Sequence, residues 1–436
     1  MNNMSTPTEM LPGPSGRTSV KKAIFAGALG NVLEWYDYGI YGCFASILSA
    51  LFFPATDPIV GLMMTFLVFG LGFVARPLGG IVFGHYADKM GRRTILSVTV
   101  ILMGLSTLLM GLLPTYQQIG VAAPVFLTIL RLLQGVATGG EWGSCTSFMV
   151  EYTTPKNRTF AVSWSQVSTA VGLLMGSFLG VFLTSVLSQE ALYSWGWRIP
   201  FICGILVALV GYYVRHNVDE TPAFQNKLQT QDVSEQPLLE AVRYYKRELC
   251  AVFLIVAGGN VAYWLVLSYM TTYITKFLKL PLERGFQINS ISLVVFAVGL
   301  PIFGWLADRI GRKKVLLTGY VLLIVLGYPL FAMLAKAQGF GQMTAIVCVL
   351  TLILSIINGV VMTVVTEIFP TKVRCSAFAI SYNVAAALFG GTSMFVATWL
   401  IQVTGNVLSV PIYMIGLMVL TFLAAAFLYQ EKQSLD

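Results

Sequence analysis

The sequence predicts an all-α membrane protein with twelve transmembrane helices in two pseudo-symmetric six-helix bundles. Three observations support this prediction: the composition, twelve long apolar segments and an internal repeat. Of the 436 residues, 56% are hydrophobic and only 11% are charged, and the mean hydropathy is +0.77. Soluble globular domains carry about 25% charged residues, so the composition excludes a soluble fold.

Twelve apolar segments are each long enough to cross a bilayer, which takes about 20 helical residues. In chain order they span residues 23–51, 58–86, 94–113, 123–149, 158–187, 198–216, 249–275, 285–306, 314–335, 342–366, 375–402 and 408–429. The first 22 residues are polar and lack the short apolar core and cleavage site of a signal peptide. We therefore expect a tail over 1–22, a bundle over 23–216, a linker over 217–248, a second bundle over 249–429 and a short tail over 430–436.

The distribution of basic residues orients the chain. Of the 27 Lys and Arg residues, 20 fall in tails and loops on the side of the N-terminus and five fall on the opposite side. Because positively charged loops stay in the cytoplasm, both termini are predicted to be cytoplasmic. The same bias accounts for the net charge of +8, so no nucleic-acid partner is expected.

The chain repeats a loop motif. GHYADKMGRR at residues 84–93 follows the second segment, and GWLADRIGRK at 304–313 follows the eighth. Two copies at matched positions predict a conformational latch between two parallel halves; a single copy could equally be a basic loop that only fixes topology. The predicted latch residues are Gly84, Asp88, Gly91, Arg92, Arg93, Asp308, Gly311 and Arg312, with the matched pairs Glu151 and Arg158, and Glu367 and Arg374.

The first apolar segment carries an unusual polar face. At about 100° per residue, one helical face about 120° wide holds Asn31, Glu34, Asp37, Tyr38 and Tyr41. A charged side chain at the bilayer centre costs about 3 kcal/mol, so this face must line a cavity or contact another helix. Both histidines lie near the cytoplasmic ends of their segments. Proton transfer at mid-membrane is therefore left to carboxylates, and Asp37 and Glu34 are the first candidates.

Two arginines lie inside the predicted helices. Arg131 and Asp37 fall at the same depth, which predicts a buried pair between the fourth and first helices. That pair is either a static ion pair or a switch in which protonation of Asp37 frees Arg131 to bind an anion. Arg76 either contacts a substrate or pairs with a carboxylate. Glu141 is a proton relay or a static partner of an arginine.

The second half carries uncharged polar residues in its apolar segments. They are Asn260, Tyr263, Asn358, Tyr382 and Asn383. Each is a candidate ligand contact, although a helix–helix hydrogen bond is the commoner role of such a residue. The sequence shows no nucleophile triad, phosphate-binding loop or metal-ligand cluster, and its six cysteines are scattered singly. We therefore expect no catalytic residue, metal or cofactor.

The repeated loop motif resembles that of the major facilitator superfamily. Five further stretches resemble its metabolite:proton symporter family: GNVLEWYD at 30–37, RPLGG at 76–80, RLLQG with GGE over 131–141, WGWRIPF at 195–201 and ETPAF at 220–224. Members of that family move citrate, 2-oxoglutarate, shikimate, proline or betaine with protons. The resemblance therefore implies proton symport. We expect alternating access in a bacterial inner membrane, by a protein that functions as a monomer.

The embedded arginines favour a small organic acid as the substrate, because a guanidinium binds carboxylate bidentately. The alternative is a zwitterionic osmolyte such as proline or betaine. Relatives that respond to osmotic stress carry a long C-terminal coiled coil, whereas this chain stops seven residues after its last segment, which disfavours the osmolyte. A polytopic membrane enzyme is the rival from another class, but it would need a catalytic constellation; a channel would not need the doubled latch.

Overall fold

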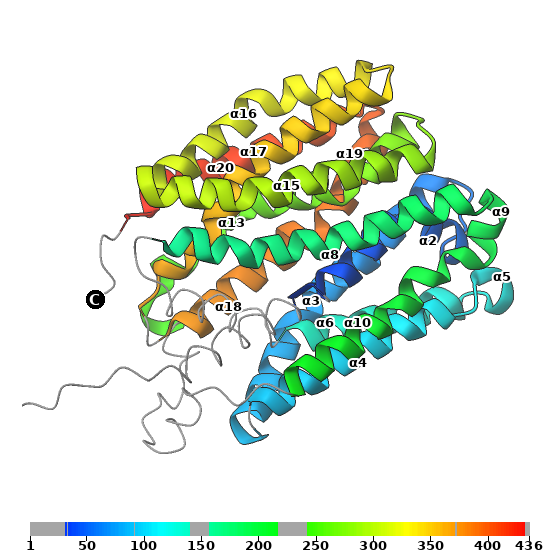
Figure 1. Ribbon diagram of the computed structural model, residues 1–436, viewed down its shortest axis with the longest axis horizontal. Coiled ribbons are helices and arrows are strands. Elements are labelled where there is room, and N and C mark those ends of the chain that lie inside the picture. Colours follow the sequence, from blue (N-terminus) through cyan, green and yellow to red (C-terminus); the bar gives the residue numbers. More distant parts are fainter. Residues whose placement is uncertain are drawn as a thin grey trace, which may run out of the picture.

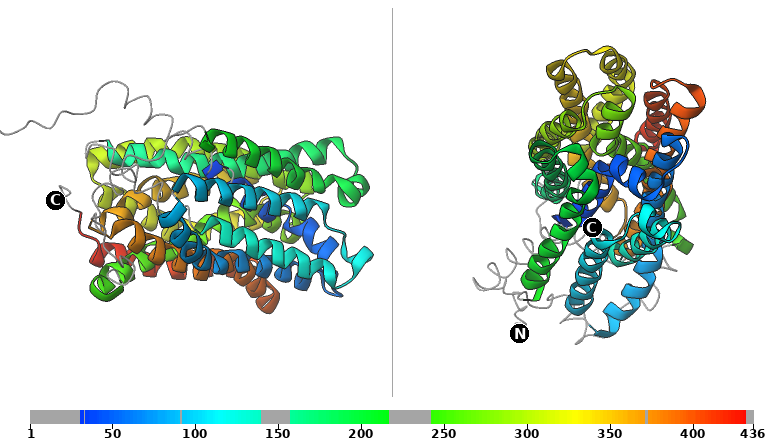
Figure 2. Two further views of the ribbon diagram at one scale, coloured as in Figure 1. Left: turned by 90° about the horizontal axis from the view of Figure 1, so that it is seen from below. Right: turned by 90° about the vertical axis from the view of Figure 1, so that its right-hand side faces the viewer.

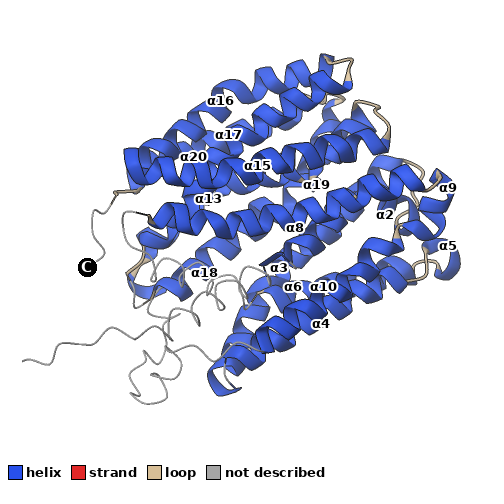
Figure 3. Ribbon diagram, in the orientation of Figure 1, coloured by secondary structure: helices blue, strands red, loops and turns tan. Residues whose placement is uncertain are grey.

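The computed structural model describes residues 31–32, 34–90, 92–139, 157–216, 242–370 and 373–431. Figure 3 shows that helices are the regular elements throughout these residues. The predictions that concern Gly91, Glu141, Glu151 and most of the 217–248 linker lie outside them.

The first half begins with helical residues 34–43. It continues with α2 (Ala45–Phe52), α3 (Pro58–Met90), α4 (Arg92–Leu112), α5 (Tyr116–Ile119), α6 (Ala122–Thr138), α8 (Arg158–Val186), α9 (Gln189–Ala191), the π-helix η1 (Leu192–Gly196) and α10 (Arg198–His216). The second half contains α13 (Lys246–Leu267), α14 (Tyr269–Thr272), η2 (Tyr273–Phe277), α15 (Leu282–Ile310), α16 (Arg312–Lys336), α17 (Phe340–Glu367), α18 (Arg374–Ala385), η3 (Ala386–Gly391), α19 (Thr392–Thr404) and α20 (Ser409–Leu428).

These elements follow the twelve predicted segments in order. Among the described residues, eight helices are long and apolar enough to span a membrane, and a pair bent by 46° at residues 189–210 forms a ninth. Ser97–Leu112 and Ala122–Thr138 are shorter apolar helices. Helical residues 34–43 with α2 correspond to the first segment. The predicted all-α, twelve-helix class is therefore confirmed, with helix ends that differ by a few residues.

The helices run along one common direction and form two groups (Figure 1). In Figure 1, α16 and α17 of the second half lie at one edge and α4, α6 and α10 of the first half lie at the opposite edge, with α8 and α18 between them. The end-on view in Figure 2 places α16 and α4 at opposite ends of the cross-section. The groups meet where α8 packs on α15 and α17, and where α3 packs on η3 and α19.

Close backbone contact joins α3 to α6 within the first group. A Cβ at Gly135 would overlap the carbonyl oxygen of Gly72, and a Cβ at Gly139 would overlap that of Arg76. Small residues permit this approach, as at many helix contacts in membranes. The contact fixes the height of Arg76 relative to Arg131, because the two arginines lie on the two joined helices.

The first and seventh helices are both interrupted, and the interruptions are neighbours. A turn at Phe44 separates residues 34–43 from α2, and Ser268 separates α13 from α14. A Cβ at Gly42 would overlap the Ser268 hydroxyl oxygen. The two breaks therefore lie against each other at the boundary between the halves.

Candidate functional site

The polar face of the first helix is buried in the protein, as predicted. Asn31, Glu34, Asp37, Tyr38 and Tyr41 are all at most 7% exposed. Asn31 donates to the Ser168 hydroxyl at 2.7 Å and to the Ser165 carbonyl at 3.0 Å, so it joins this helix to α8. Tyr41 donates to the Thr65 carbonyl of α3 at 3.2 Å.

Glu34 and Arg76 form a buried ion pair. Arg76 Nη2 lies 2.7 Å from Glu34 Oε1, and both side chains are at most 2% exposed. Arg76 Nε also donates to the Tyr38 hydroxyl at 3.2 Å, and the guanidinium lies over the Tyr38 and Phe73 rings. Of the two roles considered for Arg76, the structure shows the carboxylate pair. The pair lies within electrostatic range of Tyr382.

Arg131 does not form the expected direct ion pair with Asp37. Its Nη1 donates to Gln134 Oε1 at 2.7 Å, and Gln134 Nε2 donates to Thr107 Oγ1 at 2.6 Å. Asp37 interacts with Thr107 and lies within electrostatic range of Arg131. The acid and the base are thus related through Gln134 and Thr107.

Aromatic rings around Arg131 explain why its charge needs no direct ion pair with Asp37. The Arg131 guanidinium carbon lies 4.6 to 4.9 Å from the ring centroids of Tyr38, Tyr41 and Phe69. These rings stabilise the charge through cation–π contacts. The buried guanidinium has two nitrogen atoms, Nε and Nη2, that make no hydrogen bond.

A small cavity with about 20 Å³ of free space lies at the boundary between the two halves. Its lining residues are Trp35, Gln166, Val256, Gly259, Asn260, Tyr263, Ile357, Asn358, Val361, Met362 and Tyr382. The structure thus brings together four of the five polar residues predicted in the second half. The fifth, Asn383, is buried in α18 but does not line this cavity. Asn31, Tyr38, Tyr41, Arg76 and Arg131 also lie outside the lining.

Like Trp35, Gln166 is a cavity residue that the sequence analysis missed. It lies on α8 and is 2% exposed, and its Nε2 atom has no hydrogen-bond partner. The available signal was a polar stripe on the fifth predicted segment, which reads Ser163, Ser165, Gln166, Ser168 and Thr169. None of these residues is charged, so burying the stripe in a membrane segment carries no large energetic cost that would mark it as functional.

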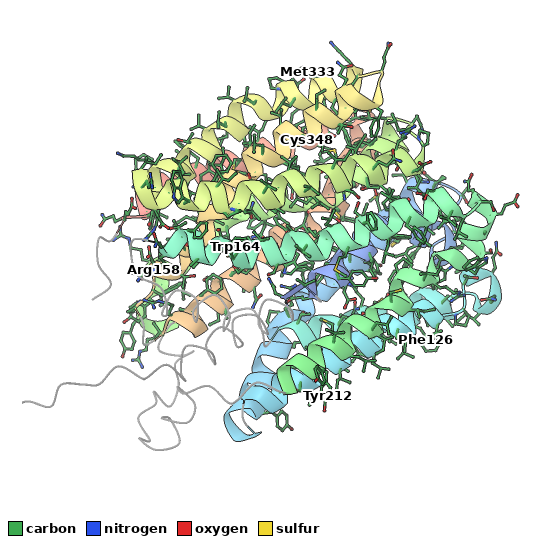
Figure 4. All side chains as sticks on the ribbon, viewed as in Figure 1. Phe126, Arg158, Trp164, Tyr212, Met333 and Cys348 are labelled. Carbon is green, nitrogen blue, oxygen red and sulfur yellow. The ribbon has the colours of Figure 1, made fainter. Side chains whose placement is uncertain are left out.

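The second copy of the loop motif joins the two halves at one end of the bundle. Asp308 accepts hydrogen bonds from the backbone N–H groups of Thr159 at 3.0 Å and Phe160 at 2.9 Å, and so caps α8. Glu367 accepts from Arg312 at 2.7 Å and from Arg158 at 2.8 Å. Figure 4 shows Arg158 at this end of the helices.

The structure describes the other predicted latch residues in different detail. Gly311 has a φ of +104°, a conformation that favours glycine, and it precedes α16. Arg374 is buried and donates to the Phe369 carbonyl at 3.2 Å. In the first copy, Gly84 and Asp88 lie in α3, and Arg92 and Arg93 begin α4. The side chains of Asp88, Arg92 and Arg93 lie outside the described part of the chain.

Two helical groups that meet around an internal cavity, with a buried Glu34–Arg76 ion pair on one side, define a transporter of the major facilitator fold. The chain belongs to the sugar (and other) transporter family, whose model matches residues 23–234 and 224–435. Among solved structures, a D-xylose-proton symporter shares the fold with a TM-score of 0.74 at 19% identity, over 96% of this chain and 99% of that one.

Curated relatives are closer in sequence. The chain is 33% identical over 419 residues to the glycine betaine/proline/ectoine/pipecolic acid transporter OusA of Dickeya dadantii, a match that covers 94% of this chain and 83% of OusA. It is 34% identical over 404 residues to the proline/betaine transporter of Escherichia coli K12, covering 90% of this chain and 80% of the relative. A putative proline/betaine transporter of Staphylococcus aureus is also 34% identical, over 414 residues.

Proposed function

We propose that this protein takes up a zwitterionic osmolyte of the proline or betaine kind together with protons, by alternating access. This reverses the order of the two substrates expected from the sequence. The similar curated transporters are named for glycine betaine, proline, ectoine and pipecolic acid, which are not di- or tricarboxylates. The embedded arginines, which had favoured an organic acid, have other partners.

One observation carries the choice of substrate. Among the described residues that line the cavity, none is charged. Arg76 pairs with Glu34, and Arg131 lies among aromatic rings and Gln134. An anion with two or three carboxylates would enter this cavity without a counter-charge, and burying an uncompensated charge is costly. A zwitterion carries no net charge, so uncharged dipoles and aromatic rings suit it better.

Proton coupling is assigned to the carboxylates of the first helix. Protonation of Glu34 would release Arg76 from its ion pair, and protonation of Asp37 would change the field at Arg131. Each step alters the charge balance beside the boundary between the halves, where the conformational change must occur. Glu141 stays a further candidate relay. The basic-residue bias supports cytoplasmic termini, and the bacterial relatives support a location in the inner membrane. We propose a monomer as the functional unit.

Uptake by purified protein in proteoliposomes tests this proposal. With an imposed inward proton gradient, radiolabelled proline or betaine should accumulate above its equilibrium level. Citrate, 2-oxoglutarate and shikimate should neither accumulate nor compete. A protonophore and protein-free liposomes serve as controls. Accumulation of an organic acid, with no response to either zwitterion, would contradict the substrate assignment; accumulation that is insensitive to the protonophore would contradict the coupling.

A further inference from the structure

We propose that the zwitterion lies across the boundary between the two halves, with its carboxylate on Gln166 and its ammonium group on the second half. We further propose that Asn260 and Asn358 hold ammonium groups that carry N–H bonds, whereas the aromatic rings hold quaternary ones. The inference rests on the proposed function and assigns the parts of the substrate to named groups.

The first half offers a hydrogen-bond donor to the cavity. Gln166 Nε2 is buried and unpartnered, and the residue lines the cavity from α8. Its Oε1 atom lies 3.4 Å from the Thr169 hydroxyl, whose shorter hydrogen bond, of 2.7 Å, goes to the Gln166 backbone carbonyl. A buried donor without a partner is costly, so a bound acceptor at this position would be favoured. The acceptor of a zwitterion is its carboxylate.

The second half offers acceptors. Asn260 Nδ2 donates to the Val256 carbonyl at 3.0 Å, and Asn358 Nδ2 donates to the Leu354 carbonyl at 3.0 Å. A backbone carbonyl can only accept, so the amide nitrogen of each asparagine must face its own helix. The Oδ1 atom of each is then the end left for a ligand. Two such acceptors on α13 and α17 suit a secondary ammonium group, which carries two N–H donors.

The same half, with the first helix, offers aromatic faces. Trp35, Tyr263 and Tyr382 line the cavity. Trp35 stacks on Trp264 with centroids 5.5 Å apart, and Tyr382 stacks on Phe378 at 5.4 Å. The stacking fixes the ring orientations before any ligand arrives. A quaternary ammonium group has no N–H to donate, but aromatic faces attract it through cation–π interactions.

The two kinds of substrate should therefore depend on different side chains. Asn358→Leu removes an acceptor and should raise the KM for proline at least tenfold, since a hydrogen bond to a charged group contributes about that much. The KM for betaine should change less than threefold. Tyr382→Leu should do the reverse. Gln166→Leu should raise both KM values together, because both substrates carry the carboxylate.

The experiment measures initial uptake rates of proline and betaine by each variant in proteoliposomes. The ratio of the two KM values is the main readout, because partial misfolding lowers the maximal rate for both substrates without moving the ratio. Asn358→Ser keeps a hydroxyl acceptor and should recover part of the proline affinity. Thr363→Val is the matched control: it is buried on the same helix but does not line the cavity.

If Asn358→Leu and Tyr382→Leu shift the ratio of the KM for proline to the KM for betaine in opposite directions, the assignment is supported. A ratio that stays constant in both variants, while the wild-type protein transports both substrates, would overturn it and leave the proposed function intact. If the wild-type protein transports neither zwitterion, the proposed function fails, and this assignment fails with it.

Discussion

At the scale of single residues, the two carboxylates of the first helix are held differently. Glu34 is in direct contact with Arg76 at 2.7 Å, whereas Asp37 forms no ion pair with Arg131 and acts on it only through the electrostatic field. A directly paired buried charge contributes to stability because its partner would otherwise be uncompensated. A carboxylate without a direct partner is easier to neutralise, which suits Asp37 to carry the proton.

Replacing each carboxylate by its amide should separate these roles. Glu34→Gln leaves the Arg76 charge buried alone, so it should cost about 3 kcal/mol or more of folding free energy. Asp37→Asn should unfold at nearly the wild-type temperature, yet lose proton-driven accumulation while retaining substrate exchange. Thermal unfolding in detergent and uptake in proteoliposomes measure the two effects.

The double variant Glu34→Gln with Arg76→Gln provides the control, since it removes both charges and should recover part of the lost stability. If Asp37→Asn still accumulates substrate in response to a proton gradient, Asp37 is not the carrier. If Glu34→Gln unfolds at the wild-type temperature, the ion pair does not stabilise the protein.

The sequence predicted the buried face of the first helix well, because carboxylates in an apolar segment have few acceptable positions. It did not predict the partner of Arg131. Depth along two helices places the charges at one level, but it does not reveal that Tyr38, Tyr41 and Phe69 surround the guanidinium. Gln166 was missed because an uncharged amide in a polar stripe resembles many helix–helix contacts.

At the scale of elements, the capping of α8 stands out because the cap comes from the other half. Asp308 on α15 accepts hydrogen bonds from the backbone N–H groups of Thr159 and Phe160, which lie in the first turn of α8. The carboxylate also opposes the positive end of the helix dipole. Asp308 Oδ1 also lies 3.6 Å from Arg312 Nη2, so the carboxylate contacts both the facing helix and a neighbouring arginine.

Substitution of Asp308 should measure this cap. Asp308→Ala removes both acceptors and the charge, so it should cost about 1 to 2 kcal/mol. Asp308→Asn keeps one acceptor and should cost less. Thermal unfolding in detergent reports the order. Glu190→Ala, an exposed substitution in α9, should change the free energy by less than about 0.5 kcal/mol. Equal losses for Asp308→Ala and Asp308→Asn would argue against a capping role.

At the scale of the whole molecule, residues of the repeated loop motif connect the two halves. The repeat spacing predicted two equivalent groups of helices, and the confirmed fold has them. The spacing could not show that Arg158 of one half and Arg312 of the other share Glu367. Such a shared contact depends on the conformational state, and one sequence encodes more than one state.

Loss of the shared carboxylate should change the balance between states. Glu367→Gln weakens the contact between the halves at this end, so the cavity should open more often towards it. A single cysteine placed by Met362→Cys in a cysteine-free protein lines the cavity and reports opening. Its alkylation from that side should accelerate about tenfold. Glu283→Gln, at the start of α15, is the charge-matched control. Unchanged alkylation in a folded Glu367→Gln protein would contradict a latch.

The backbone contact between α3 and α6 has a mechanical consequence. Helices that touch through glycines cannot slide past each other without steric overlap. We therefore expect α3 and α6 to move as one rigid unit that carries Arg76 and Arg131. Any bending during the conformational change must then occur in other helices. The interruptions at Phe44 and Ser268, which lie against each other, supply a hinge in each half. A carrier built in this way keeps the spacing of its fixed positive charges constant and bends where its helices are already broken.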